Sequence, residues 1–84
     1  MSQTNIKKVL ADYGLEDKEI KIYLAILKLK NATVREIALA TKIKRTSVYL
    51  SAEKLVARGI MGQYKAKYGT HYTIDKPEDL ILRL

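Results

Sequence analysis

The chain has 84 residues, contains no cysteine and carries a formal net charge of +7 at pH 7. This length fits one domain, and the absence of thiols excludes disulfide bonds and thiolate metal clusters. A hydrophobic content of 48%, with no apolar run longer than residues 22–27, argues against both disorder and a membrane span, so we expect a soluble protein of the cytoplasm.

Two helices are predicted before residue 30. Residues 5–13 place apolar side chains at helical spacing and are followed by Gly14, a common helix stop. Residues 17–29 carry a broader apolar stripe, with acidic residues in the first turn and lysine near the end, which suits the helix dipole. Asn31 is expected to lie in the turn that follows.

A tight turn is predicted between the next two helices. Thr33 and Glu36 match the T-x-x-E capping box, so a short helix is expected over residues 34–41. Residues 41–43 make the break, and a longer helix follows that ends near residue 58. Its buried seam is expected to contain Val48, Ala52 and Leu55, which recur at i, i+4 and i+7.

The periodicity then changes from that of a helix to that of strands. Residues 60–67 alternate in polarity, Tyr72 and Ile74 share the inward face of a second segment, and Tyr68-Gly69 is the expected tip of the hairpin between them. A last helix is expected to follow, with an apolar side made of Leu80, Ile81 and Leu84.

This order of elements is that of a winged helix-turn-helix, so the predicted fold is mainly α with a small β-hairpin. The helix-turn-helix would span about residues 34–58 and the wing about residues 60–74. Residues 41–69 carry seven Lys and Arg against one Glu, whereas the rest of the chain is close to balanced. Such a basic segment is typical of a surface that binds nucleic acid, and a lysine-rich surface that serves solubility alone is the alternative.

The expected partner is double-stranded DNA, read in the major groove by the start of the longer helix. There Arg45 can donate two hydrogen bonds to a guanine, and Lys44 suits a phosphate. The predicted contacts of this helix are Lys44, Arg45, Thr46, Ser47, Tyr49, Ser51 and Lys54, the last two on the side opposite the seam. The predicted contacts of the wing are Lys65, Lys67, Tyr68, Thr70 and His71, and those of the helix before the turn are Thr33, Arg35 and Lys42.

Four of these side chains also have a structural explanation. Thr46 and Ser47 suit a helix cap, Tyr49 neighbours the seam and suits the core, and Tyr68 suits an ordinary turn. Leu50 is expected to be exposed, where a thymine methyl group, a partner subunit or the wing are the candidate contacts.

No pattern in the chain predicts catalysis or a bound cofactor. His71, the single histidine, lacks the spaced partners of a zinc site, and the four glycines form no phosphate-binding loop. The acidic residues lie mainly at helix starts, and no nucleophile is paired with a base. We therefore expect no enzyme activity, no metal and no cofactor.

With its elements placed, the sequence resembles the N-terminal domain of the TrmB family of regulators, a largely archaeal winged-helix group. The resemblance covers nearly the whole chain, through Leu10-x-x-Tyr13-Gly14-Leu15, Glu19-x-Lys21-x-Tyr23-Leu24, residues 32–38, Ile43-x-Arg45-x-x-Val48-Tyr49, Leu55-x-x-x-Gly59-Ile60, Tyr72 and Pro77. It implies duplex DNA binding through the helix opened by residues 44–47, a wing at residues 65–71, and frequent dimer formation.

The chain departs from the family pattern at three points. Lys42 stands where helix-turn-helix units often have glycine, so either a residue with a side chain adopts the strained turn angle or the turn differs slightly. Ala52 replaces a larger apolar residue. Longer family members carry a C-terminal domain that binds sugars, and nothing in this sequence resembles it, so the resemblance does not extend to sugar sensing and no small-molecule effector is expected.

Three functions compete at this point. The first is a sequence-specific transcription regulator associated with the nucleoid, expected to act as a homodimer through its last helix or through Ile6, Val9 and Leu10. The second is a nonspecific architectural DNA-binding protein, which the ratio of twelve Lys to four Arg favours slightly. The third is a winged-helix module that binds another protein, which the basic segment argues against.

Overall fold

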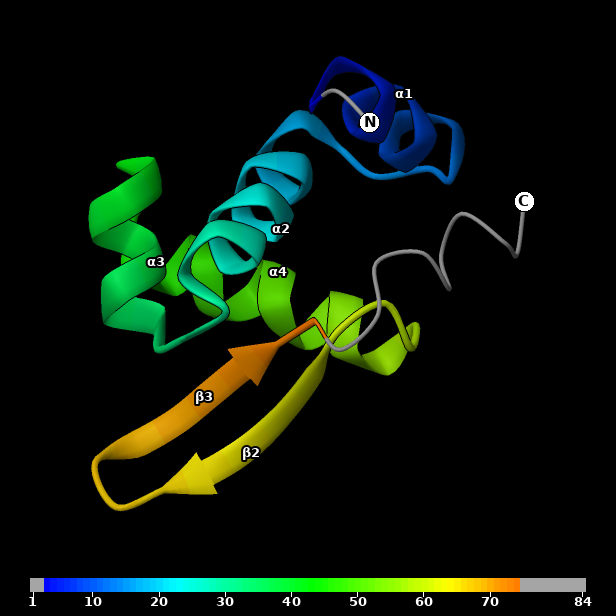
Figure 1. The fold of residues 1–84 in the computed structure, drawn as a ribbon. Coiled ribbons are helices and arrows are strands. Elements are labelled where there is room, and N and C mark those ends of the chain that lie inside the picture. The colour runs from blue at the N-terminus through cyan, green and yellow to red at the C-terminus, as the bar shows by residue number, and fades with distance from the viewer. Residues whose placement is uncertain (1–2, 75–84) are drawn as a thin grey trace.

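Four helices and a small sheet make up the part of the chain that the computed structural model describes, residues 3–74 (Figure 1). They follow in the order α1 (Gln3–Asp12), α2 (Asp17–Leu29), β1 (Asn31–Ala32), α3 (Val34–Thr41), α4 (Arg45–Ala57), β2 (Gly62–Ala66) and β3 (Gly69–Thr73). The winged helix-turn-helix predicted from the sequence is confirmed. The last helix expected after the hairpin, with Leu80, Ile81 and Leu84, lies outside the described residues.

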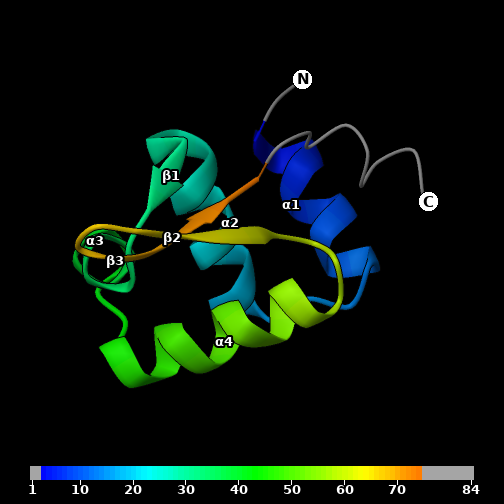
Figure 2. The same ribbon diagram turned by 90° about the horizontal axis from the view of Figure 1, so that it is seen from below.

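The sheet has three antiparallel strands in the order β1-β3-β2, not the two that the sequence predicted. Asn31 was expected in a turn, but it pairs with Thr73, and Ala32 pairs with Tyr72 (Figure 2). A strand of two residues is too short to show an alternating pattern, so its sequence carries no strand signal. The third strand joins the wing to the chain segment that leads into α3.

The core lies between α2, α3, α4 and β3. Burial follows the predicted helical spacing, and the seam of α4 is confirmed. The completely or almost completely buried side chains are Leu10, Ile22, Tyr23, Ile26, Ala32, Ile37, Val48, Ala52, Leu55 and Tyr72. Because these residues come from helices and from the wing strand, the wing is part of the core and not an appendage to it.

The turn between α3 and α4 has the strained angle predicted for it. Lys42 adopts a left-handed conformation, with φ 61° and ψ 29°, and its amide donates a 2.8 Å hydrogen bond to the carbonyl of Ala38. The Thr41 hydroxyl donates to the carbonyl of Ile37 at 2.7 Å and accepts from the amide of Ile43 at 3.3 Å. These bonds satisfy the polar groups of the turn and hold the two helices at a fixed angle.

The hairpin tip lies one residue earlier than predicted. Ala66 pairs with Gly69, so the two-residue turn is Lys67-Tyr68, and Gly69 opens β3 with φ 132°. A side chain is strained at that angle, which explains the glycine. None of the helices within residues 3–74 is long and apolar enough to span a bilayer.

Candidate nucleic-acid interface

The start of α4 presents a cationic, outward-facing end. Lys44 precedes the helix as its N-cap residue without a capping side-chain hydrogen bond, and Arg45 is the first helical residue. Both side chains are exposed, as is Thr46, whereas Ser47 is partly buried. Thr46 and Ser47 lie inside the helix, so the interpretation of either as the cap is wrong. Exposed backbone N–H groups at such a helix start favour an anion, because the helix dipole adds to their positive charge.

Ser51 does not lie on the outward face of α4. Its side chain is 6% exposed and packs beside the seam, three residues after Val48 and four before Leu55. The prediction that it faces away from the seam is therefore wrong, because the i+3 and i+4 spacings bring it to the buried side. Lys54 is exposed, as predicted.

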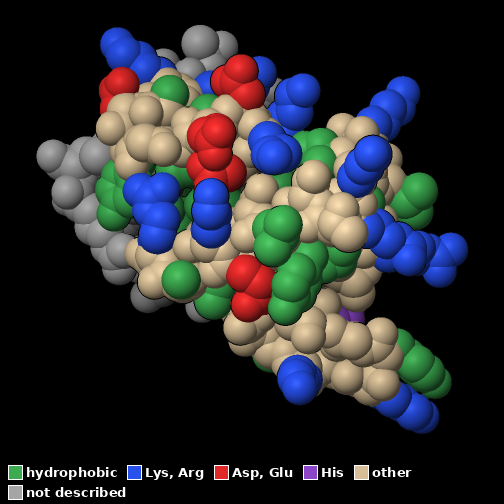
Figure 3. Space-filling view, turned by 180° about the vertical axis from the view of Figure 1, so that it is seen from behind, with side chains coloured by type: hydrophobic (Ala, Val, Ile, Leu, Met, Phe, Trp, Pro, Cys, Tyr) green, Lys and Arg blue, Asp and Glu red, His purple; other side chains and the backbone are tan. Residues whose placement is uncertain are grey.

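Two large apolar side chains lie on the outside of α4. Tyr49 is 51% exposed, so its assignment to the core is wrong, and Leu50 is 64% exposed, as expected. Together with Val34, Arg45 and Thr46 they line an open pocket of about 430 Å³. In the view from behind, Lys and Arg side chains gather on the side of α3 and the start of α4, next to a hydrophobic patch, and the wing projects below (Figure 3).

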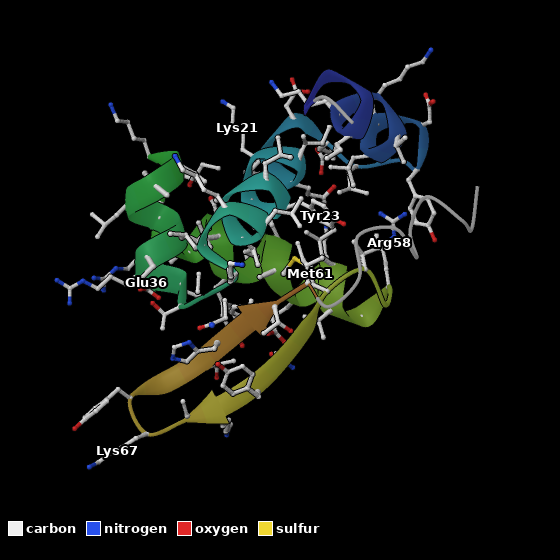
Figure 4. The ribbon with its side chains drawn as sticks, in the orientation of Figure 1. Lys21, Tyr23, Glu36, Arg58, Met61 and Lys67 are labelled. Carbon is white, nitrogen blue, oxygen red and sulfur yellow. The ribbon has the colours of Figure 1, made fainter. Side chains whose placement is uncertain are left out.

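The tip of the wing combines an aromatic side chain with a cation. Tyr68 is 87% exposed, and the ammonium group of Lys67 lies 5.5 Å from the centre of its ring. Lys67 sits in the turn at the far end of the hairpin, away from the helices (Figure 4). Lys65 is exposed on β2, and Thr70 is partly buried on β3. The tip thus offers positive charge and an apolar ring at the point farthest from the core.

His71 lies in the middle of the wing and not at its tip, because it pairs with Tyr64, the central residue of β2. Its Nδ1 lies 2.9 Å from Oδ1 of Asn31, and its ring stacks on Tyr64 with 5.3 Å between centroids and 11° between planes. The pairing of β1 with β3 creates the first of these contacts. No group of three or more potential metal ligands occurs within residues 3–74.

Of the DNA contacts predicted on α3 and at the turn, Thr33 caps the helix, whereas Arg35 and Lys42 are exposed. The Thr33 hydroxyl accepts from the amide of Glu36 at 3.2 Å, and the amide of Thr33 donates to Oε1 of Glu36 at 2.9 Å, which confirms the capping box. The bond from the Thr33 amide holds the pKa of the Glu36 carboxyl below its usual value. Arg35 and Lys42 are exposed, and their contact with DNA stays a prediction.

Arg58 is one of the cations of the basic segment, but its side chain contacts Tyr13 at the end of α1. Its guanidinium donates a 3.0 Å hydrogen bond to the carbonyl of Tyr13 and lies 5.7 Å from the centre of that residue's ring. It lies at the end of α4 remote from the wing tip (Figure 4). This cation therefore fastens the end of α1 to α4, a contact across 45 residues that no local pattern indicates.

Sequence reasoning also missed the link between α4 and the wing. The hydroxyl of Tyr72 donates a 2.9 Å hydrogen bond to Oε2 of Glu53. Burial, and then this bond to a carboxylate, raise the pKa of Tyr72 above its ordinary value. The pair fixes the position of β3 relative to α4, so the two predicted DNA-contacting elements keep one geometry.

Comparison with known proteins identifies the family. The family model described as "Sugar-specific transcriptional regulator TrmB" matches residues 10–77. A sequence search of curated proteins gives no match. Among solved structures, the ST1889 protein of the archaeon Sulfolobus tokodaii is 20% identical with a TM-score of 0.76, over 99% of this chain and 94% of that one.

Two bacterial proteins have a similar fold. BpsR of Bordetella bronchiseptica, whose DNA binding is regulated by 6-hydroxynicotinic acid, is 15% identical with a TM-score of 0.74, over 93% of this chain and 58% of that one. The YusO protein of Bacillus subtilis is 16% identical with a TM-score of 0.73, over 95% and 62%. The chain thus spans about three fifths of these two proteins, and at such identities the likeness concerns the fold alone. The family match covers most of the chain, which therefore belongs to the TrmB family of transcriptional regulators.

Proposed function

We propose that the chain is a sequence-specific regulator that binds double-stranded DNA, with α4 in the major groove and the wing on the phosphate backbone or in the minor groove. The observation that carries the proposal is the two-sided character of α4. One side is buried through Val48, Ala52 and Leu55, while the start of the helix holds Lys44 and Arg45 exposed to solvent. A helix fixed in this way can enter a groove without rearrangement.

Within this proposal the contacts fall into two classes. Arg45 reads a base, because its guanidinium can donate two hydrogen bonds to a guanine, with Thr46 beside it. Lys44 and the exposed amides of the first turn of α4 bind phosphate. Lys42, Arg35 and Lys54 are assigned to the backbone as well.

The wing contributes a second set of contacts, since its tip lies at the same end of the molecule as the start of α4 (Figure 2). Lys65, Lys67 and Tyr68 are exposed on it, and we assign them to the backbone or the minor groove. Thr70 pairs with Lys65 near the tip and His71 lies in the middle of β3; both are partly buried and are assigned a supporting role. Thr33 and Ser47 keep their assignment as contacts near the helix starts, whereas Ser51 is removed because it is buried.

We further propose that the protein acts as a homodimer on the nucleoid, without catalytic activity. Family membership supports this assembly, because two-fold symmetric regulators bind two half-sites one helical turn apart. The sugar specificity in the family description is not extended to this chain, since the described residues supply only the elements of a winged helix-turn-helix.

The test is selection of bound duplexes from a random DNA pool at near-physiological salt, followed by sequencing. An enriched motif supports sequence-specific binding, and a palindromic motif supports the dimer. Binding without enrichment would replace the proposal by the architectural alternative. Loss of all DNA during washing would instead favour a protein-binding module.

The architectural alternative has one specific observation in its favour. The chain has twelve Lys and four Arg, and lysine binds phosphate as a point charge whereas arginine reads bases. The guanidinium of Arg58 is hydrogen-bonded to the carbonyl of Tyr13. Among the described residues, Arg35 and Arg45 are then the arginines available to a duplex. Base reading thus depends strongly on Arg45.

A further inference from the structure

The open pocket on α4 lies beside the cations that bind DNA in the proposed function. Leu50 is 64% exposed and Tyr49 is 51% exposed, although apolar side chains of this size are usually withdrawn from water. Val34 of α3 contributes the opposite wall, and Arg45 and Thr46 complete the lining of about 430 Å³. The same arginine therefore borders the pocket and opens the helix.

Leu50 occupies the middle of the outward face of α4. It lies two residues after the buried Val48, which turns it to the side opposite the seam, and four residues after the exposed Thr46. A duplex that contacts Arg45 and Thr46 must consequently lie over Leu50 as well. The groups of the duplex that face Leu50 are then removed from water together with the Leu50 side chain.

The surroundings of the pocket select its occupant. Arg45 lines the pocket, and the exposed Lys44 directly precedes it in the chain. A second hollow that Leu50 also lines contains Lys54 and Glu53, and this carboxylate already accepts a hydrogen bond from Tyr72. The positive charge beside the pocket disfavours a second copy of a chain with a net charge of +7. A polyanion with small apolar groups on its surface is complementary. In the major groove of DNA the apolar group is the C5-methyl of thymine.

Resting on the proposed function, we infer that Leu50 and Tyr49 form a site for thymine methyl groups and thereby determine part of the sequence preference. Arg45 reads guanine at the start of the helix, and the pocket next to it reads thymine. The recognised half-site then contains at least one thymine whose methyl group strengthens binding, within one or two base pairs of the guanine.

The test uses the duplex that the wild-type protein enriches, resynthesised with deoxyuridine in place of each thymidine in turn. This change removes the methyl group and leaves every hydrogen-bonding group of the base pair in place. At the contacted thymine we expect binding about fourfold weaker, from burial of one carbon worth about 0.8 kcal/mol. For Leu50→Ala the same substitution should have no effect.

Leu39→Ala is the matched control. Leu39 is 72% exposed on α3 and does not line the pocket, so this variant should respond to deoxyuridine like the wild type. Equal affinity of the wild-type protein for the thymine and uracil duplexes at every position would overturn the inference and leave the proposed function intact. Failure to enrich any duplex would overturn both. The wild-type comparison changes the DNA alone, so that outcome does not depend on how the variants fold.

Discussion

The hydroxyl of Tyr72 on β3 donates a 2.9 Å hydrogen bond to the carboxylate of Glu53 on α4. Tyr72 is buried and Glu53 is partly buried, so this bond joins the wing to the proposed recognition helix inside the protein. It also supplies a hydrogen-bond donor to Glu53, which is the one acidic residue among residues 41–69. This bond therefore helps to set the distance between α4 and the wing in the protein without DNA.

Replacement of Tyr72 by phenylalanine should lower the free energy of unfolding by about 1–2 kcal/mol. The ring keeps its packing, but a partly buried carboxylate loses its donor. Urea unfolding followed by circular dichroism measures the difference. Tyr68→Phe, at the exposed tip, is the control and should leave stability unchanged. Equal stability of Tyr72→Phe and wild type would show that water replaces the bond.

The same pair predicts a loss of stability in alkali. The folded pKa of Tyr72 is raised above the unfolded value of about 10, so the folded state holds a proton that the unfolded state releases. Its contribution is complete below about pH 10 and falls as the pH rises toward the folded pKa. Tyr72→Phe should therefore show a smaller decline in stability than the wild type between about pH 9 and about pH 11.

The capping box predicts a pH dependence of the opposite sign. The folded pKa of Glu36 is lowered by the bond from the Thr33 amide, so its contribution is present above the unfolded pKa and is lost as the pH falls through the folded value. Glu36→Gln can keep the capping bond without a charge. In acid denaturation followed by circular dichroism, we expect the variant to lose less stability than the wild type on acidification. Parallel curves would contradict this assignment.

Substitution of Arg45 and substitution of Lys67 should change DNA binding in different ways. Arg45→Ala should relax the base preference at one position in each half-site, by about 1–3 kcal/mol of discrimination. Lys67→Ala should weaken binding to all sequences alike and lower the salt slope by about 1. Fluorescence anisotropy at several salt concentrations separates the two effects. Lys21 on α2 points away from the hairpin (Figure 4), so Lys21→Ala is the control. A uniform loss for Arg45→Ala would count against base reading.

Arg58→Ala should affect stability and not DNA binding. The variant loses the hydrogen bond to the carbonyl of Tyr13 and the contact with its ring, a loss of about 0.5–1.5 kcal/mol. Hydrogen exchange should show faster opening of α1 in particular. A reduced salt slope, of the kind expected for Lys67→Ala, would instead assign Arg58 to the DNA contact.

Lys42→Gly should stabilise the fold while weakening DNA binding. A left-handed residue with a Cβ is strained by about 1–2 kcal/mol, and glycine removes this strain at a smaller cost in chain entropy. We expect a net gain of about 0.5–1 kcal/mol in urea unfolding. The lost charge should lower the salt slope by about 1 if Lys42 contacts a phosphate. An unchanged slope would remove Lys42 from the interface.

The features that the sequence predicted are those that depend on neighbours along the chain. The capping box of Thr33 and Glu36 and the seam through Val48 need only spacings of three, four or seven residues. Ser51 was misplaced because a hydroxyl looks like a surface group, although its spacing from the seam shows that it is buried.

The missed features depend on contacts between distant segments. The bond from Arg58 to Tyr13 spans 45 residues, and the pairing of Asn31 with Thr73 joins a two-residue strand to the wing. Neither leaves a periodic pattern. A charge count therefore did not show that Arg58 contacts Tyr13, and the expected hairpin lacked its third strand.

That third strand has a kinetic consequence. With β1 on one side and β2 on the other, β3 has no open edge at Tyr72 and Thr73, so the base of the wing is held on both sides before the protein meets a ligand. Binding to a duplex then costs little conformational entropy at this part of the wing and is close to rigid-body association. The rate of encounter should accordingly follow the electrostatic attraction between the duplex and the basic face, and should fall steeply as salt screens it.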